Sequence, residues 1–93
     1  MSEININYPV ECQLEESVET MRHLLQLLEQ KYGIKHQFED DHVCLLSGSG
    51  VDGQVNIGED GIEIFARLGF FMIPFKSVIE NEIITKLDEH FSA

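Results

Sequence analysis

Four short stretches with strand-like patterns, three of them alternating between apolar and polar residues, lie between positions 34 and 68, and they limit the possible fold more than any other feature of the chain. These predicted strands cover residues 34–38, 42–47, 51–57 and 62–68. Turn-forming residues separate them at Asp40-Asp41, at 47–50 and at 58–61. Such short connections join antiparallel neighbours, because parallel strands need a crossover of about a dozen residues or more. The strand at 42–47 is apolar on both faces, which predicts a central position.

A further strand and a helix precede this region. Apolar residues alternate from Ile4 to Val10, and Pro9, which has no N–H to donate, indicates a strand at a sheet edge. The next segment has apolar residues at steps of three and four, which is the period of one helical face. That face consists of Leu14, Val18, Met21, Leu25, Leu28 and Tyr32. Gly33 follows as the expected left-handed cap, so the sequence predicts a helix over about 13–32.

A second helix is predicted over 74–91. Pro74 is a favoured first helical residue. The predicted buried stripe consists of Phe75, Val78, Ile79, Ile83, Leu87 and Phe91. The expected order of elements is therefore β-α-β-β-β-β-α, an α+β domain. We expect a five-stranded antiparallel sheet in the order 2-3-4-5-1, with both helices packed on one face. Residues 1–93 form a single domain, too small to enclose a large catalytic cavity.

The chain is strongly acidic. It has 17 acidic residues against 6 basic ones, giving a net charge of −11. A surface with this charge repels phosphate backbones and anionic lipid headgroups, so nucleic acids and membrane surfaces are poor partners. The sequence contains no secretion signal and no apolar run of the roughly 18 residues that a membrane span needs. We therefore expect a cytoplasmic protein in which Cys12 and Cys44 stay reduced.

The sequence contains no convincing catalytic, cofactor or metal site. Residues 48–53 have the G-x-G-x-x-G spacing of a dinucleotide loop, but they precede a strand, and that chemistry needs a helix N-terminus. Ser47 and Ser49 lie near His42 without the sharp strand-to-helix turn of a nucleophilic serine. Residues of metal-ligand type gather at His36, Glu39, Asp40, Asp41 and His42. The acids occupy a predicted turn and no third His or Cys joins them, so we predict neither metal nor cofactor.

The segment between the last strand and the last helix is the candidate contact surface. Four large apolar side chains lie between Leu68 and Pro74, where the chain must also turn. Composition alone allows them to wedge beneath the last helix or to stay exposed as a surface for an apolar partner. Phe65 and Arg67 point to the face of the sheet opposite the helices, where Arg67 can pair with Asp52. The candidate contact residues are Phe65, Arg67, Phe70, Phe71, Met72, Ile73, Phe75 and Lys76.

Several short motifs together carry a family resemblance. They are Ser49-Gly-Val-Asp-Gly53, Ala66-Arg-Leu-Gly-Phe70, Pro74-Phe-Lys76, Ile79-Glu80, Glu82-Ile83 and Lys86-Leu-Asp88 with Phe91. The chain resembles the putative polyhydroxyalkanoic acid system proteins, which are small bacterial proteins of about this length. The resemblance covers nearly the whole chain and is closest from residue 49 to residue 91.

The resemblance implies a non-enzymatic protein associated with polyhydroxyalkanoate storage granules, acting as a binding or interaction module. The implied partners are granule proteins, the polymer surface or a second copy of the chain. A different class of function stays open, namely a small-ligand or acyl-group binding protein with a pocket between the sheet and the last helix. Such a protein should contain a closed cavity of roughly 300 Å³ or more.

Overall fold

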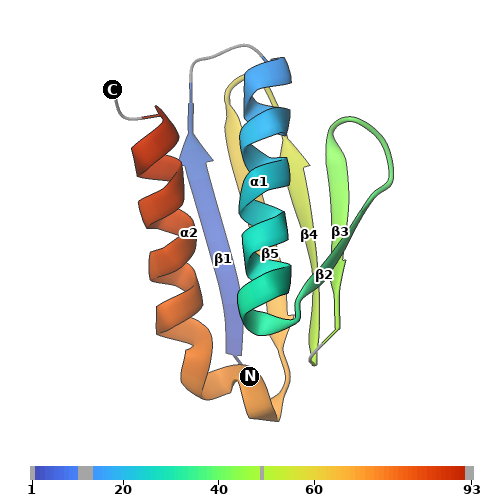
Figure 1. Cartoon of the computed structure of the whole chain (residues 1–93), viewed down its shortest axis with the longest axis vertical. Coiled ribbons are helices and arrows are strands. Elements are labelled where there is room, and N and C mark those ends of the chain that lie inside the picture. The colour runs from blue at the N-terminus through green and yellow to red at the C-terminus, as the bar shows by residue number, and fades with distance from the viewer. Residues whose placement is uncertain (1, 11–13, 49, 92–93) are drawn as a thin grey trace.

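A computed structural model describes residues 2–10, 14–48 and 50–91 of the chain. Cys12 and Ser49 lie outside the described residues. Two helices lie across one face of a five-stranded antiparallel sheet (Figure 1). The strands are β1 (Ser2–Pro9), β2 (Lys35–Phe38), β3 (Val43–Ser47), β4 (Val51–Ile57) and β5 (Gly61–Leu68). The helices are α1 (Leu14–Tyr32), the 3₁₀ segment η1 (Phe70–Phe75) and α2 (Lys76–Phe91).

The sheet has the predicted strand order. Its strands lie in the sequence β1-β5-β4-β3-β2, so the first strand pairs antiparallel with the last. β1 is an edge strand, as Pro9 indicated, and Pro9 lies opposite Gly61. The hairpins β2–β3, β3–β4 and β4–β5 are all antiparallel, as their short connections require. The predicted fold is therefore confirmed.

The core lies between the sheet and the two helices. α1 contributes Met21, Leu24, Leu25 and Leu28, and α2 contributes Ile79, Ile83 and Leu87. The inward positions of the strands supply the other side; Ile4, Val55, Ile62 and Ile64 are among them. Cys44 is completely buried on β3, and this burial raises the pKa of its thiol. Two side chains of the predicted α1 face, Val18 and Tyr32, are only partly buried and border the core.

The C-terminal cap of α1 and the β2–β3 turn both have the predicted structure. Gly33 has a φ of 72°, a conformation that other residues adopt with strain, and its N–H donates to the carbonyl of Glu29 at 2.9 Å. In the β2–β3 turn, the carboxylate of Asp40 accepts hydrogen bonds from the backbone N–H groups of His42 and Val43, at 2.7 and 2.9 Å. This local hydrogen bonding is a typical use of Asp in a turn.

The start of the last helix differs from the prediction. Pro74 is not the first residue of α2. It lies inside η1, and α2 begins at Lys76. A 3₁₀ segment has about three residues per turn, so it shifts the side chains before Lys76 out of phase with the α-helix. Phe75 is consequently exposed, although the sequence pattern placed it in the buried stripe. Val78, also assigned to that stripe, lies within α2 beside the buried Ile79 and is exposed as well.

Candidate interaction surface

The segment η1 forms the connection between β5 and α2 at one end of the molecule (Figure 1). It starts after Gly69, whose N–H donates to the carbonyl of Gly50 in the β3–β4 turn at 2.7 Å. A β-carbon at position 69 would lie 2.9 Å from that carbonyl oxygen, which explains the need for glycine there. The Met72 N–H then donates to the Gly69 carbonyl at 3.0 Å and closes the turn. These two backbone hydrogen bonds therefore fix the position of η1 relative to the β3–β4 turn.

The side chains of η1 divide between core and solvent. Phe70 and Phe71 leave 81% and 85% of their surface exposed, and their rings meet edge to face with centroids 5.7 Å apart. Ile73 and Phe75 are also exposed. Met72 is different: it is 8% exposed and belongs to the core, so it does not line the surface. We call the exposed set Phe70, Phe71, Ile73 and Phe75 the aromatic turn.

The helix that follows the aromatic turn is held at its middle and near its end. At its middle, Lys31 of α1 forms an ion pair with Glu82. Near its end, the hydroxyl of Tyr8 donates to the carboxylate of Asp88 at 2.5 Å, and the rings of Tyr8 and Phe91 approach to 6.3 Å. The hydrogen bond to Asp88 is the main reason that the pKa of Tyr8 is raised. The exposure of the aromatic turn is thus not a consequence of a loose helix.

The outer face of the sheet carries the remaining candidate residues. Phe65 is 39% exposed there, and the cross-strand register places it in one row with Leu45, which is 37% exposed. Arg67 lies opposite Asp52, as expected, and also opposite Glu3 on the other neighbouring strand. The carboxylate oxygen of Glu3 is 4.0 Å from the Arg67 Nε, and both side chains are solvent-exposed. No described element covers this face (Figure 1).

The aromatic turn and the outer face are separate surfaces. Arg67 and Lys76 flank the aromatic turn in sequence, and Lys76 is the first residue of α2. Phe65 projects from the middle of β5, two positions before Arg67, and lies beside Asn5 and Gln54. The structure thus divides the eight predicted contact residues among the aromatic turn, the sheet face, the core (Met72) and the start of α2 (Lys76).

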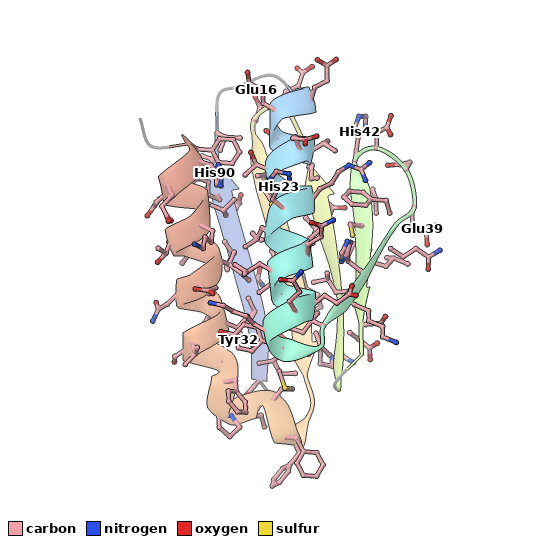
Figure 2. The ribbon with its side chains drawn as sticks, in the orientation of Figure 1. Glu16, His23, Tyr32, Glu39, His42 and His90 are labelled. Atoms are coloured by element: carbon pink, nitrogen blue, oxygen red, sulfur yellow. The ribbon has the colours of Figure 1, made fainter. Side chains whose placement is uncertain are left out.

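The residues of metal-ligand type do not converge. His36 lies on β2, on the side of the sheet that the helices cover, with its ring edge-on to Phe38. Its Nδ1 is 3.5 Å from a carboxylate oxygen of Glu29, without the geometry of a hydrogen bond. His42 projects into solvent from the β2–β3 turn (Figure 2). Among the described residues, no group of three or more His, Cys, Asp or Glu side chains is placed to hold a metal ion.

The interior offers little room for a ligand. The cavity between the sheet and the helices has a volume of about 20 Å³ and is lined by core residues such as Met21, Leu25 and Ile83. That volume accommodates about one water molecule, whereas small-molecule sites measure roughly 300–1,000 Å³. In the segment with dinucleotide-loop spacing, Gly48 and Gly50 lie in the β3–β4 turn, and the next element is the strand β4 rather than a helix.

Sequence comparison places the chain among known proteins. The profile of a family described as "Putative polyhydroxyalkanoic acid system protein" matches residues 4–91, which is nearly the whole chain. The chain belongs to this family. The family resemblance of the short motifs is thereby confirmed. No curated protein and no solved structure gave a significant match.

Within residues 2–10, 14–48 and 50–91, no helix combines the length and apolar character needed to cross a bilayer.

Proposed function

We propose that this polyhydroxyalkanoic acid system protein is a non-enzymatic contact module, located in the cytoplasm at storage granules, and that it binds through the aromatic turn. The single observation that carries the proposal is the exposure of Phe70 and Phe71, each above 80%, on a turn fixed by backbone hydrogen bonds. Large aromatic side chains held out in water on a rigid support are typical of contact surfaces.

The energetics support a contact of moderate strength. Complete burial of a Phe side chain stabilises by about 1.5–3 kcal/mol relative to exposure, so burial of both rings contributes about 3–6 kcal/mol. The edge-to-face pair presents these rings together, and Ile73 and Phe75 extend the apolar area. Association costs several kcal/mol in lost freedom of motion, which leaves a reversible interaction unless many copies bind side by side.

A ligand-binding function receives less support. A cavity of about 20 Å³ has no room for an acyl group between the sheet and α2. The described residues also lack a cluster of ligating side chains that could hold a metal for catalysis. A contact role requires exposed apolar side chains on a fixed segment. The aromatic turn provides them, because the buried Met72 attaches η1 to the core.

Granule co-sedimentation tests the proposal. Cells that accumulate polymer are lysed, granules are separated on a density gradient, and the protein is quantified in the granule fraction. We expect the wild-type protein in that fraction and the double variant Phe70→Ser/Phe71→Ser largely absent from it. Phe65→Ser is the matched control, because it also removes an exposed phenylalanine, but from the outer face of the sheet.

The results distinguish between the aromatic turn and the outer face of the sheet as the contact surface. A granule-bound Phe70→Ser/Phe71→Ser variant, together with a released Phe65→Ser variant, would transfer the contact role to the outer sheet face. A wild-type protein that is absent from granules would reject the contact function at this site altogether. Circular dichroism of each purified variant confirms that the fold is retained.

A further inference from the structure

The charges of the protein are segregated along its long axis. At the end away from η1, the first turn of α1 and the turns β2–β3 and β4–β5 expose only acidic charges among their Asp, Glu, Lys and Arg residues. These residues are Glu15, Glu16, Glu39, Asp40, Asp41, Glu59 and Asp60. In Figure 2, Glu16 and His42 mark this end, and Tyr32 lies towards the other. We call it the acidic end.

The end that carries the aromatic turn is close to charge balance. Four of the six basic residues belong to it: Lys31, Lys35, Arg67 and Lys76. Two of them are paired within the protein, Lys31 with Glu82 and Arg67 with Glu3. The excess negative charge of the acidic end is therefore not repeated around the aromatic turn.

The two ends are electrostatically independent. Glu15 and Lys31 are 16 residues apart on α1, which corresponds to about 24 Å along the helix. The Debye length at physiological ionic strength is about 8 Å, so the charges of one end are largely screened at the other. The net charge of −11 thus describes the whole molecule but not the surface around Phe70 and Phe71.

We propose that the aromatic turn docks directly on the surface of the uncharged polyester, which holds the protein in one orientation with its acidic end in water. This inference rests on the proposed function and names its partner as the polymer. A coat of molecules in this orientation gives each particle a negative outer surface. Coated particles then repel one another and do not coalesce.

Charge and shape favour the polymer over a protein partner. A polyester of hydroxyalkanoic acids presents ester groups and alkyl chains without formal charge, which suits a contact end that lacks the excess negative charge of the acidic end. The aromatic turn also projects from the molecule, with two rings more than 80% exposed. A yielding apolar surface accepts such a projection anywhere, whereas a protein partner needs a shaped pocket.

A second copy of the chain is a less suitable partner, because the aromatic turn offers too small an area for a stable dimer. Two aromatic turns meeting tip to tip would bury only a few side chains on each copy. A stable protein interface buries about 800 Å² per partner, contributed by roughly 20–30 residues.

Protein-free particles of purified polyhydroxyalkanoate provide the test. Binding is measured by sedimentation over a range of protein concentrations, and the zeta potential of the coated particles is measured at saturation. Three proteins are compared: the wild type, Phe70→Ser/Phe71→Ser, and the acidic-end variant Asp41→Asn/Glu59→Gln/Asp60→Asn. The three substituted acids are exposed turn residues, remote from the aromatic turn.

We expect the wild type to bind and to make the particles more negative. The aromatic-turn variant should bind at least about tenfold more weakly, because it loses most of the exposed apolar surface. The acidic-end variant should bind within about twofold of the wild type, since its changes lie several Debye lengths from the contact. Its coated particles should have a less negative zeta potential and should flocculate at lower salt.

Other results would overturn the inference. Wild-type protein that binds native granules but not bare polymer would show a granule protein as the partner, and the proposed function would stand. Equal binding to phosphatidylcholine vesicles would remove the polyester as the specific partner. An acidic-end variant that loses binding as strongly as the aromatic-turn variant would refute the orientation. Absence of binding to both bare polymer and native granules would reject the inference and the proposed function together.

Discussion

Met72 is buried with 8% of its surface exposed, whereas Phe71, its neighbour in the chain, is 85% exposed. Adjacent residues of the 3₁₀ turn thus divide two tasks, since Met72 anchors the turn to the core and Phe71 presents an aromatic ring to solvent. The backbone of the turn is thereby fixed by a buried residue while the neighbouring ring stays exposed. This difference in burial predicts that serine at position 72 lowers the stability of the fold strongly, whereas serine at position 71 hardly changes it.

Met72→Ser should destabilise the fold by about 2–5 kcal/mol, because it removes a buried side chain and places a hydroxyl in an apolar site. Phe71→Ser should change the free energy of unfolding by less than about 0.5 kcal/mol, as is usual for exposed positions. Urea denaturation followed by circular dichroism measures both. Equal destabilisation by the two variants would show that Phe71 belongs to the core.

Leu25 tests the packing of α1 on the sheet. It is 1% exposed and lines the small cavity in the core. Leu25→Ala should lower the free energy of unfolding by about 2–5 kcal/mol through lost burial and an enlarged cavity. Gln26→Ala, on the exposed side of the same turn, is the control and should be nearly neutral. A Leu25→Ala variant with an unchanged melting temperature would remove this face of α1 from the core.

Tyr8 gives the stability a defined dependence on alkaline pH. Its hydrogen bond to Asp88, together with partial burial, raises its pKa above the ordinary value of 10.0. A group whose pKa is raised on folding contributes stability that is fully present below the unfolded pKa and is lost as the pH rises through the folded pKa. Wild-type stability should therefore fall more steeply above about pH 10 than that of Tyr8→Phe.

Urea denaturation at pH 8 and pH 11 measures this difference. Asp88→Asn is the control, because it keeps the tyrosine but removes the carboxylate that accepts the hydrogen bond from its hydroxyl. If the wild type and Tyr8→Phe lose the same free energy of unfolding between pH 8 and pH 11, the Tyr8–Asp88 hydrogen bond does not contribute to the pH dependence.

The sequence was sufficient to predict most of the sheet. Short connections allow few arrangements of five strands, and the alternation of side chains determines the inner face of each strand. Gly33 and Asp40 were predictable because a left-handed cap and a turn each require particular residue types. These features depend on local chemistry, and local chemistry can be read from neighbouring residues.

The aromatic turn was harder to predict because helical periodicity does not extend through it. Pro74 indicated a helix start, but the change from 3₁₀ to α geometry at Lys76 shifts the phase of the side chains. Phe75, four residues before the buried Ile79, would face the core in a continuous α-helix and is exposed instead. Composition also could not decide that Met72 alone among the four residues from Phe70 to Ile73 is buried.

The segregation of charge was equally hidden. Acidic residues occur along the whole sequence, and the net charge alone argued against anionic surfaces as partners. Their concentration at one end follows from the antiparallel topology, which brings the β2–β3 and β4–β5 turns to the same end of the sheet. Only the folded chain distinguishes a uniformly acidic surface from an acidic end.

The most direct test of the contact surface is hydroxyl-radical footprinting of the wild-type protein, free and bound to purified polymer granules. Phenylalanine oxidation is quantified by mass spectrometry for Phe70, Phe71 and Phe65 in the same sample, so the outer sheet face serves as an internal control. We predict that granule binding protects Phe70 and Phe71 and leaves the oxidation rate of Phe65 unchanged. Protection of Phe65 with continued oxidation of Phe70 and Phe71 would contradict the assignment of the aromatic turn as the contact surface.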